Sequence, residues 1–141
     1  MSSEIEGILS SVNTYLDALY NGDTDLFKTV LHPQVQLSSG TESTLVTMNR
    51  EQYMDVVSNR PSPASRGDQR RDIIDSITRS SPTSGHARVR NTYAPKRFVD
   101  DLILVLNDGH WWIISKTWHY TLNEERSVLG TSGDTAETSA H

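Results

Sequence analysis

The stretch "FVDDLILVLNDGHWWIISKTW", residues 98–118, places an apolar, strand-forming run on each side of one Asp-Gly pair. Asp-Gly flanked by such runs is a strong local signal for an antiparallel hairpin with a two-residue turn. If Asp108 and Gly109 are the central turn residues, Asn107 lies opposite His110, and the other cross-strand pairs follow by counting outward. The stretch therefore predicts a long two-stranded hairpin.

Counting from this turn assigns each side chain to a face, because successive side chains point to opposite sides of a strand. The face that we expect to point inward carries Asp100, Leu102, Leu104, Leu106, Trp111, Ile113, Ser115 and Thr117. The opposite face carries Val99, Asp101, Ile103, Val105, Trp112, Ile114, Lys116 and Trp118. Both faces are rich in apolar residues, so both are expected to be covered.

The segments before this hairpin show helical and strand patterns in turn. Apolar residues recur at three- and four-residue steps over 5–19 and again over 26–31 until Pro33, which predicts two helices. A short hairpin over 35–48 follows, and a third helix begins after Asn49, where Gln52 completes a capping box. Strands are predicted over 72–80, 86–93, 98–106 and 111–120.

Helices first and a long antiparallel sheet afterwards indicate an α+β domain. We expect three N-terminal helices packed on a strongly curved, mainly antiparallel sheet, which forms a cone with a pocket. One domain is expected to span residues 1–122. Residues 123–141 are polar and small without a burial pattern, and they predict a flexible tail.

The composition argues against several classes of function. A net charge of −5 is atypical of a general nucleic-acid binder, which relies on clustered Lys and Arg. Cysteine is absent, which rules out disulfides and thiolate chemistry. No apolar run approaches the ~18 residues of a membrane span, so the sequence predicts a soluble, cytoplasmic protein. The sequence also contains a local cluster of arginines, which we expect to lie on a solvated loop and a strand edge: Arg60, Arg66, Arg70, Arg71 and Arg79.

The outer aspartate of the acidic pair is expected to be structural. A four-residue connection at 94–97 would place Arg90 opposite Asp101. Asp101 would then lie between Arg90 and Lys116 in an opposite-charge ladder on the outer face. A one-residue slip of the register would exchange the roles of the two acids.

The inner aspartate has two possible roles. The same connection places Asn91 opposite Asp100, with Thr117 on its other side. Asp100 is then either a structural carboxylate satisfied by these neighbours or a general acid or base on an apolar wall. The residue pattern alone leaves both roles open.

Several motifs, taken in order, resemble the nuclear transport factor 2-like superfamily, and most closely its lumazine-binding and SnoaL-like branches. The matching pieces are "YLDALYNGDTDLFKTVLHPQVQL" at 15–37 and "DDLILVLNDGHWWIISKTW" at 100–118. They supply a tyrosine-bearing first helix, a Gly-Asp turn, a His-Pro pair, and a late Asp-x-Leu-x-Leu hairpin ending in Gly-x-Trp-x-Ile-x-x-Lys. The resemblance covers about residues 5–120. It implies the cone-shaped fold and sheet-to-sheet dimers, which are common among such proteins.

The candidate catalytic residues are Asp100, His32 and Tyr15. The position of His32 often borders the pocket in the resembling families. His32 would then exchange protons with Asp100; the alternative is a helix-end histidine bonded to local carbonyl groups. Tyr15 lies on the buried stripe of the first helix, either as a core residue or as a hydroxyl donor aimed into the cone. No metal-ligand spacing and no cofactor motif is visible. The ligand-contact candidates are Tyr53, Asn91, Tyr93, Leu102, Trp111 and Thr117. The aromatic residues among them are more often core residues than ligand contacts.

Three kinds of function fit these residues. One is a cofactor-free acid/base enzyme of the isomerase, lyase, cyclase or epoxide hydrolase type, acting on a small apolar or aromatic molecule; the resembling superfamily contains isomerases, lyases and hydrolases. The others are a non-catalytic carrier or sensor and a structural dimerisation domain. A homodimer is predicted through the outer patch formed by Ile103, Val105, Trp112, Ile114 and Trp118.

Overall fold

The computed structural model describes residues 2–122, with side chains from residue 5 onward. The helices are α1 (Ser2–Asn21), α2 (Thr24–Phe27) and α3 (Arg50–Ser58). The strands are β1 (Leu31–Ser39), β2 (Val46–Met48), β3 (Ile73–Ser81), β4 (Ser84–Tyr93), β5 (Lys96–Asn107) and β6 (His110–Leu122). The tail predicted over 123–141 lies outside the described residues.

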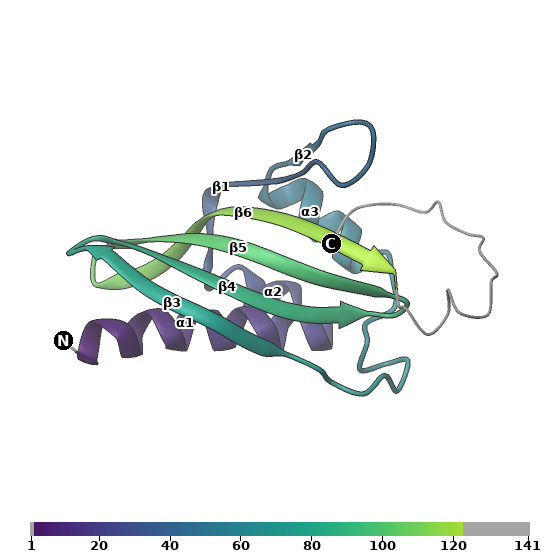
Figure 1. Cartoon of the computed structure of the whole chain (residues 1–141), viewed down its shortest axis with the longest axis horizontal. Helices are drawn as coiled ribbons and strands as arrows, with labels where there is room; N and C mark the ends of the chain where they lie inside the picture. Colours follow the sequence, from purple (N-terminus) through teal and green to yellow (C-terminus); the bar gives the residue numbers. More distant parts are fainter. Residues whose placement is uncertain (1, 123–141) are drawn as a thin grey trace.

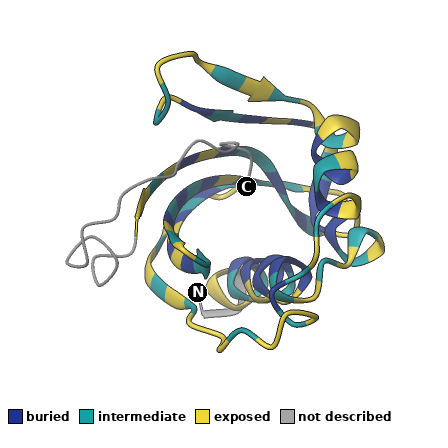
Figure 2. Cartoon of the chain, turned by 90° about the vertical axis from the view of Figure 1, so that its right-hand side faces the viewer, coloured by how far each residue is buried: buried dark blue, intermediate teal, exposed yellow. Residues whose placement is uncertain are grey.

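The strands form one six-stranded sheet in the order β2-β1-β6-β5-β4-β3. Neighbouring strands are antiparallel, except that β1 runs parallel to β6. The sheet curves strongly and remains open, with α1 lying along its concave side (Figures 1 and 2). The prediction of an α+β fold, with three helices packed on a curved and mainly antiparallel sheet, is confirmed. Within the described residues, none of the helices has the length and apolar character needed to cross a membrane.

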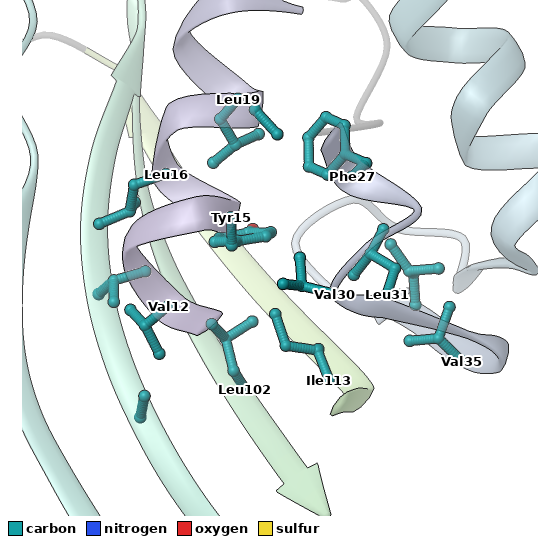
Figure 3. Close-up of a cluster of buried hydrophobic side chains, with 14 of the residues drawn as sticks. Val12, Tyr15, Leu16, Leu19, Phe27, Val30, Leu31, Val35, Leu102 and Ile113 are labelled. Atoms are coloured by element: carbon teal, nitrogen blue, oxygen red, sulfur yellow. The ribbon is translucent and has the colours of Figure 1, made fainter. Parts of the chain in front are cut away.

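Helix α1 supplies much of the core, because its apolar residues recur at helical spacing. Ile8, Val12, Tyr15 and Leu19 are all buried and face the sheet. Figure 3 shows Tyr15 among buried side chains from α1, from the segment after α2 and from the sheet. Gly7 permits close packing, since a Cβ there would lie 2.7 Å from a ring carbon of Trp111.

The second helix ends earlier than predicted. It ends at Phe27, and β1 begins at Leu31, so the predicted end of this helix belongs to a strand. The amide of Ile113 donates to the carbonyl of Val30 over 2.7 Å, and Leu31 pairs with Ile113. Pairing with a strand far along the chain overrides the local helical spacing, which the sequence pattern could not reveal.

The third helix begins as predicted. The Asn49 side chain accepts from the Gln52 amide at 2.8 Å, and the Gln52 side chain accepts from the Asn49 amide at 2.9 Å. These two bonds form the expected capping box, which satisfies two backbone donors at the start of α3.

The late hairpin turns where predicted, but β6 contains a bulge. Pairs near the turn follow the expected register as far as Leu104 and Ile113. Ile103 then pairs with Ser115, so Ile114 is the extra residue, and every later residue of β6 moves by one position. The inner face of the distal half of β6 was therefore predicted wrongly. Lys116 and Trp118 lie inside the protein, and Thr117 is exposed.

The connection between β4 and β5 is also shorter than predicted. Ala94 and Pro95, joined by a cis peptide bond, link Tyr93 directly to its partner Lys96. Because this connection has two residues in place of the predicted four, the register shifts by two positions and each side chain keeps its face. Asp100 therefore still points inward on the same side as Asn91, which is now its diagonal neighbour.

Candidate functional site

Asp100 is fully buried on the concave face of β5. Its Oδ2 accepts a hydrogen bond of 2.7 Å from the Tyr15 hydroxyl on α1 and one of 2.9 Å from the Asn91 amide on β4. Burying a carboxyl group is costly, and such hydrogen bonds offset part of that cost. Burial raises the pKa of Tyr15, and the nearby negative charge of Asp100 raises it further. The phenol therefore stays protonated and can donate.

Lys116 is fully buried beside this group. Its Nζ donates to the Tyr53 hydroxyl at 3.1 Å and lies over three aromatic rings. The distances to the ring centroids are 4.5 Å for Tyr53, 5.2 Å for Tyr15 and 5.5 Å for Trp118. Aromatic faces attract an ammonium group, and they are also apolar enough to strip it of water.

The amine of Lys116 is strongly perturbed by this environment. Burial lowers its pKa from 10.5 to about 7, against the opposing effect of the negative charge of Asp100 and with a further lowering by Arg60. At neutral pH the neutral amine and the ammonium are thus both populated. Burial likewise raises the pKa of Tyr53, while Arg60 opposes that rise by its charge and by a hydrogen bond to the Tyr53 hydroxyl.

A small cavity opens where the segment 59–72 crosses the ends of α1 and β4. Its volume of about 10 Å³ accommodates roughly one water molecule. Asn91 lines this cavity and also donates to Asp100, so it connects the cavity with the buried carboxyl group. The other lining residues are Leu19, Tyr20, Arg60, Pro63, Arg70, Arg71, Asp72, Thr92 and Tyr93.

Tyr93 fastens the segment 59–72 over this cavity. Its hydroxyl donates to the Pro61 carbonyl at 2.7 Å, and the guanidinium groups of Arg60 and Arg66 each lie 4.6 Å from its ring centroid. The Ala64 amide also donates to a carbonyl of α1, at 3.0 Å. The cavity is therefore covered by a segment that side-chain contacts hold in place.

Two larger hollows lie elsewhere on the described surface. One, of about 340 Å³, is lined by β1, β2 and the start of α3, and the other, of about 320 Å³, lies between α2 and α3. Neither is lined by Asn91 or Arg60, the two residues that connect the small cavity with Asp100 and Tyr53. We therefore place the candidate site at the small cavity, which adjoins the buried titratable groups.

Residues 3–119 match the model of the family described as Putative lumazine-binding. The chain belongs to this family. No curated protein matches it.

Among solved structures, the chain is similar to a nuclear transport factor 2-like protein of unknown function from Silicibacter pomeroyi, with 22% identity and a TM-score of 0.76. That match covers 85% of this chain and 98% of the other. A nuclear transport factor 2-like protein of unknown function from Methylobacillus flagellatus shows 23% identity, coverage of 86% and 94%, and a TM-score of 0.74. A ketosteroid isomerase-like protein from Erwinia carotovora atroseptica shows 11% identity, coverage of 85% and 98%, and a TM-score of 0.68. These likenesses establish the nuclear transport factor 2-like fold.

In this member of the Putative lumazine-binding family, the fold brings together Asp100, Tyr15, Asn91 and Tyr53 from four separate elements. Among the other expected contacts, Leu102 and Trp111 are buried core residues, and Tyr93 holds the covering segment. The roles of these residues in ligand binding stay predictions.

His32 and Thr117 do not join the site. The His32 ring packs edge-on against Trp112 at 5.3 Å, and its Nδ1 accepts from the Gln34 amide at 3.0 Å. Trp112 points away from the buried Trp111 and Ile113 because side chains alternate along β6, so His32 lies on the convex side, away from Asp100. The predicted proton transfer between His32 and Asp100 is therefore wrong, as is the inward position of Thr117.

Sequence reasoning missed Lys116, Trp118 and Arg60 as components of the site. The run from Trp111 to Ile114 is apolar at every position, so alternation could not reveal which residue is the extra one in the bulge. Arg60 lies in a segment without periodicity, and its contacts depend on where that segment crosses α1.

Asp101 lies on the convex face and belongs to an ion-pair cluster with different partners from those predicted. Its Oδ1 accepts from Arg88 Nε at 2.9 Å and from His86 Nε2 at 3.0 Å. Partial burial raises the pKa of Asp101, but the hydrogen bonds from Arg88 and His86 outweigh this and lower it. Arg90 instead binds Asp75, at 2.6 Å, because the shorter connection moved the register by two.

Proposed function

We propose that this chain is a small-molecule-binding pocket protein that transfers protons with Asp100. The observation that carries the proposal is the fully buried carboxyl group, held by Tyr15 and Asn91 with the perturbed amine of Lys116 beside it. A core selected for stability alone is better served by apolar residues than by buried ionisable groups. Clusters of perturbed titratable groups next to a cavity are typical of functional sites.

In the proposed reaction, the carboxylate of Asp100 removes a proton from carbon beside a carbonyl group. Charge then develops on the carbonyl oxygen. Because Asp100 is protonated at that point, the Tyr15 hydroxyl, whose single hydrogen was bonded to Asp100, can turn and donate it to this oxygen. Return of the proton at another position gives isomerisation, and loss of a leaving group gives elimination. Asn91 holds the carboxyl group in place, and the chemistry needs no cofactor.

The proposed ligand is a small molecule with an apolar or aromatic body. Apolar and aromatic side chains in the lining of the cavity suit such a body; they are Leu19, Tyr20, Pro63 and Tyr93. Because the cavity accommodates roughly one water molecule, a ligand enters only when the segment 59–72 and the side chain of Arg60 move aside. Closure over the ligand would then exclude water from the reacting groups.

A structural dimerisation domain is the second candidate, and the dense packing of the interior favours it. The convex face also bears Ile103, which is 40% exposed, next to the partly buried Val105, Trp112 and Ile114. We propose that this patch mediates a homodimer in either case. Trp118, which was predicted to belong to the patch, lies in the interior, so the interface is smaller than the sequence suggested.

The two candidates differ in what Asp100 does. Thermal-shift screening against small carbonyl and aromatic compounds would identify a ligand, and Asp100→Asn would then be compared with the native protein. Retained binding with loss of turnover supports proton transfer by Asp100. Asp101→Asn is the matched control, because Asp101 follows Asp100 in the chain but its carboxyl group lies on the opposite face of the sheet. Unchanged turnover in Asp100→Asn would remove Asp100 from the reaction, whereas the absence of any ligand and of any turnover would leave the structural candidate.

A further inference from the structure

Positive charge extends from the cavity to the buried amine. Lys116 Nζ donates to the hydroxyl of Tyr53, and the guanidinium of Arg60 also makes a hydrogen bond with that hydroxyl. Arg60 lines the cavity and stacks on Tyr93, so one side chain reaches both the opening and the interior. Two cationic groups thus converge on one phenol.

The rim of the cavity is also rich in arginine. Arg60, Arg70 and Arg71 line it, with Asp72 as an acidic neighbour. Arg70 is neutralised by Asp72 at 2.6 Å and by Asp17 at 2.7 Å. These arginines, expected from the sequence to form a solvated loop, therefore face the cavity of a protein whose net charge is −5.

We infer that the pocket takes a small organic carboxylate, whose charged end is held by Arg60, Tyr53 and Lys116. The inference rests on the proposed pocket and names the class of its ligand. A guanidinium and a phenol both donate to a carboxylate, and Arg binds such a group through two parallel hydrogen bonds. Like charge keeps the anionic end away from Asp100, so the rest of the molecule faces the carboxyl group.

Binding of an anion there changes the protonation of Lys116. The charged and titratable groups that face its amine are Tyr15 from α1, Tyr53 from α3, Asp100 from β5 and Arg60 from the covering segment. Burial and Arg60 hold the pKa of the amine at about 7, against the effect of Asp100. A bound anion favours the ammonium form. At a pH of about 8, binding therefore takes up protons from solution, up to about one per ligand.

The test uses the full chain and matched probes. Benzoate, cyclohexanecarboxylate and naphthoate would each be compared with the corresponding primary amide by isothermal titration calorimetry. We expect at least one acid to bind about tenfold or more tightly than its amide, as loss of one charge-assisted hydrogen bond implies. Arg60→Gln should remove this preference, and Arg60→Lys should restore part of it. Arg90→Gln is the control, because Arg90 pairs with Asp75 and does not line the cavity.

Proton uptake provides a second readout. Titrations in buffers of different ionisation enthalpy should show uptake with the native protein and none with Lys116→Met. Equal affinity for acids and amides would overturn the inference about the anion and leave the pocket itself standing. Absence of binding by every probe would overturn both the anion site and the proposed ligand pocket. Preferential binding of acids without any turnover that depends on Asp100 would support the anion site and reject the proposed proton transfer.

Discussion

The Tyr15 hydroxyl lies 2.7 Å from Oδ2 of Asp100, although 85 residues separate the two along the chain. Helix α1 therefore supplies a donor to a carboxyl group on the far hairpin, and both groups are fully buried. This contact ties the first element of the chain to the candidate site. Its strength is directly measurable.

Tyr15→Phe should lower the free energy of unfolding by about 1.5–3 kcal/mol if Asp100 is ionised, because the lost hydrogen bond has a charged acceptor. Tyr20→Phe is the comparison, since its hydroxyl donates at 2.6 Å to the neutral carbonyl of Asp68 in a partly buried position. That change should cost about 0.5–1.5 kcal/mol. Urea unfolding followed by circular dichroism measures both. A smaller loss for Tyr15→Phe than for Tyr20→Phe would argue against a charged, buried Asp100.

The bulge at Ile114 makes a second prediction, because it decides which residues of β6 point inward. Trp118→Ala should cost about 3–5 kcal/mol, as removal of a large buried side chain does. Thr117→Ala should change stability by about 0.5 kcal/mol or less, since Thr117 is exposed. Urea unfolding of the native protein and the two variants measures both changes in the free energy of unfolding. The opposite ranking would mean that β6 follows the regular register without a bulge.

The buried amine of Lys116 should make the free energy of unfolding depend on pH. Its pKa in the folded protein is about 7, below the ordinary value of 10.5, so the unfolded chain binds more protons between these values. The buried amine therefore lowers the free energy of unfolding most below a pH of about 7. This loss of stability diminishes as the pH rises toward about 10.5. Lys116→Met should be more stable than the native protein at a pH of about 6, on the order of a few kcal/mol.

The advantage of Lys116→Met should shrink between a pH of about 7 and about 10, because the native amine loses its charge in that range. Denaturant unfolding of both proteins at several pH values isolates this effect from other titrating groups. A difference that stays constant with pH would show that the amine is not desolvated. Lys96→Met, at a partly exposed position, is the control and should show no such trend.

The sequence predicts those parts of the fold that local patterns determine. The Asp108-Gly109 turn, the capping box at Asn49 and the buried stripe of α1 each depend on residues close together in the chain, and all three occur. Asp100 was placed correctly on the inner face, because the bulge lies in the partner strand and leaves the alternation of β5 intact.

The remaining features depend on contacts between distant segments. The pairing of Leu31 with Ile113 converts the predicted end of a helix into strand β1 and carries His32 to the convex side. The bulge at Ile114 lies in a run where every residue is apolar, so no local pattern marks it. Lys116 therefore looked like an exposed partner of Asp101, whereas it is a buried neighbour of the candidate site.

The convex patch makes a prediction about assembly. Light scattering should give a mass of about twice the 15.8 kDa of one chain if the patch pairs two copies. Trp112→Glu places a charge in the patch and should shift the mass to that of one chain. Arg97→Glu, at an exposed position near the other end of β5, should leave the dimer intact. A native mass near 15.8 kDa at micromolar concentration would contradict the proposed homodimer.

The most direct test of proton transfer by Asp100 requires no knowledge of the natural substrate. Small ketones, enones and α-keto acids dissolved in D2O exchange carbon-bound hydrogen beside the carbonyl group, and proton NMR follows the exchange. The native protein should accelerate exchange in at least one compound, and Asp100→Asn should reduce that acceleration by about 10²–10⁴-fold while Asp101→Asn retains it. Equal acceleration by the native protein and Asp100→Asn would contradict the account.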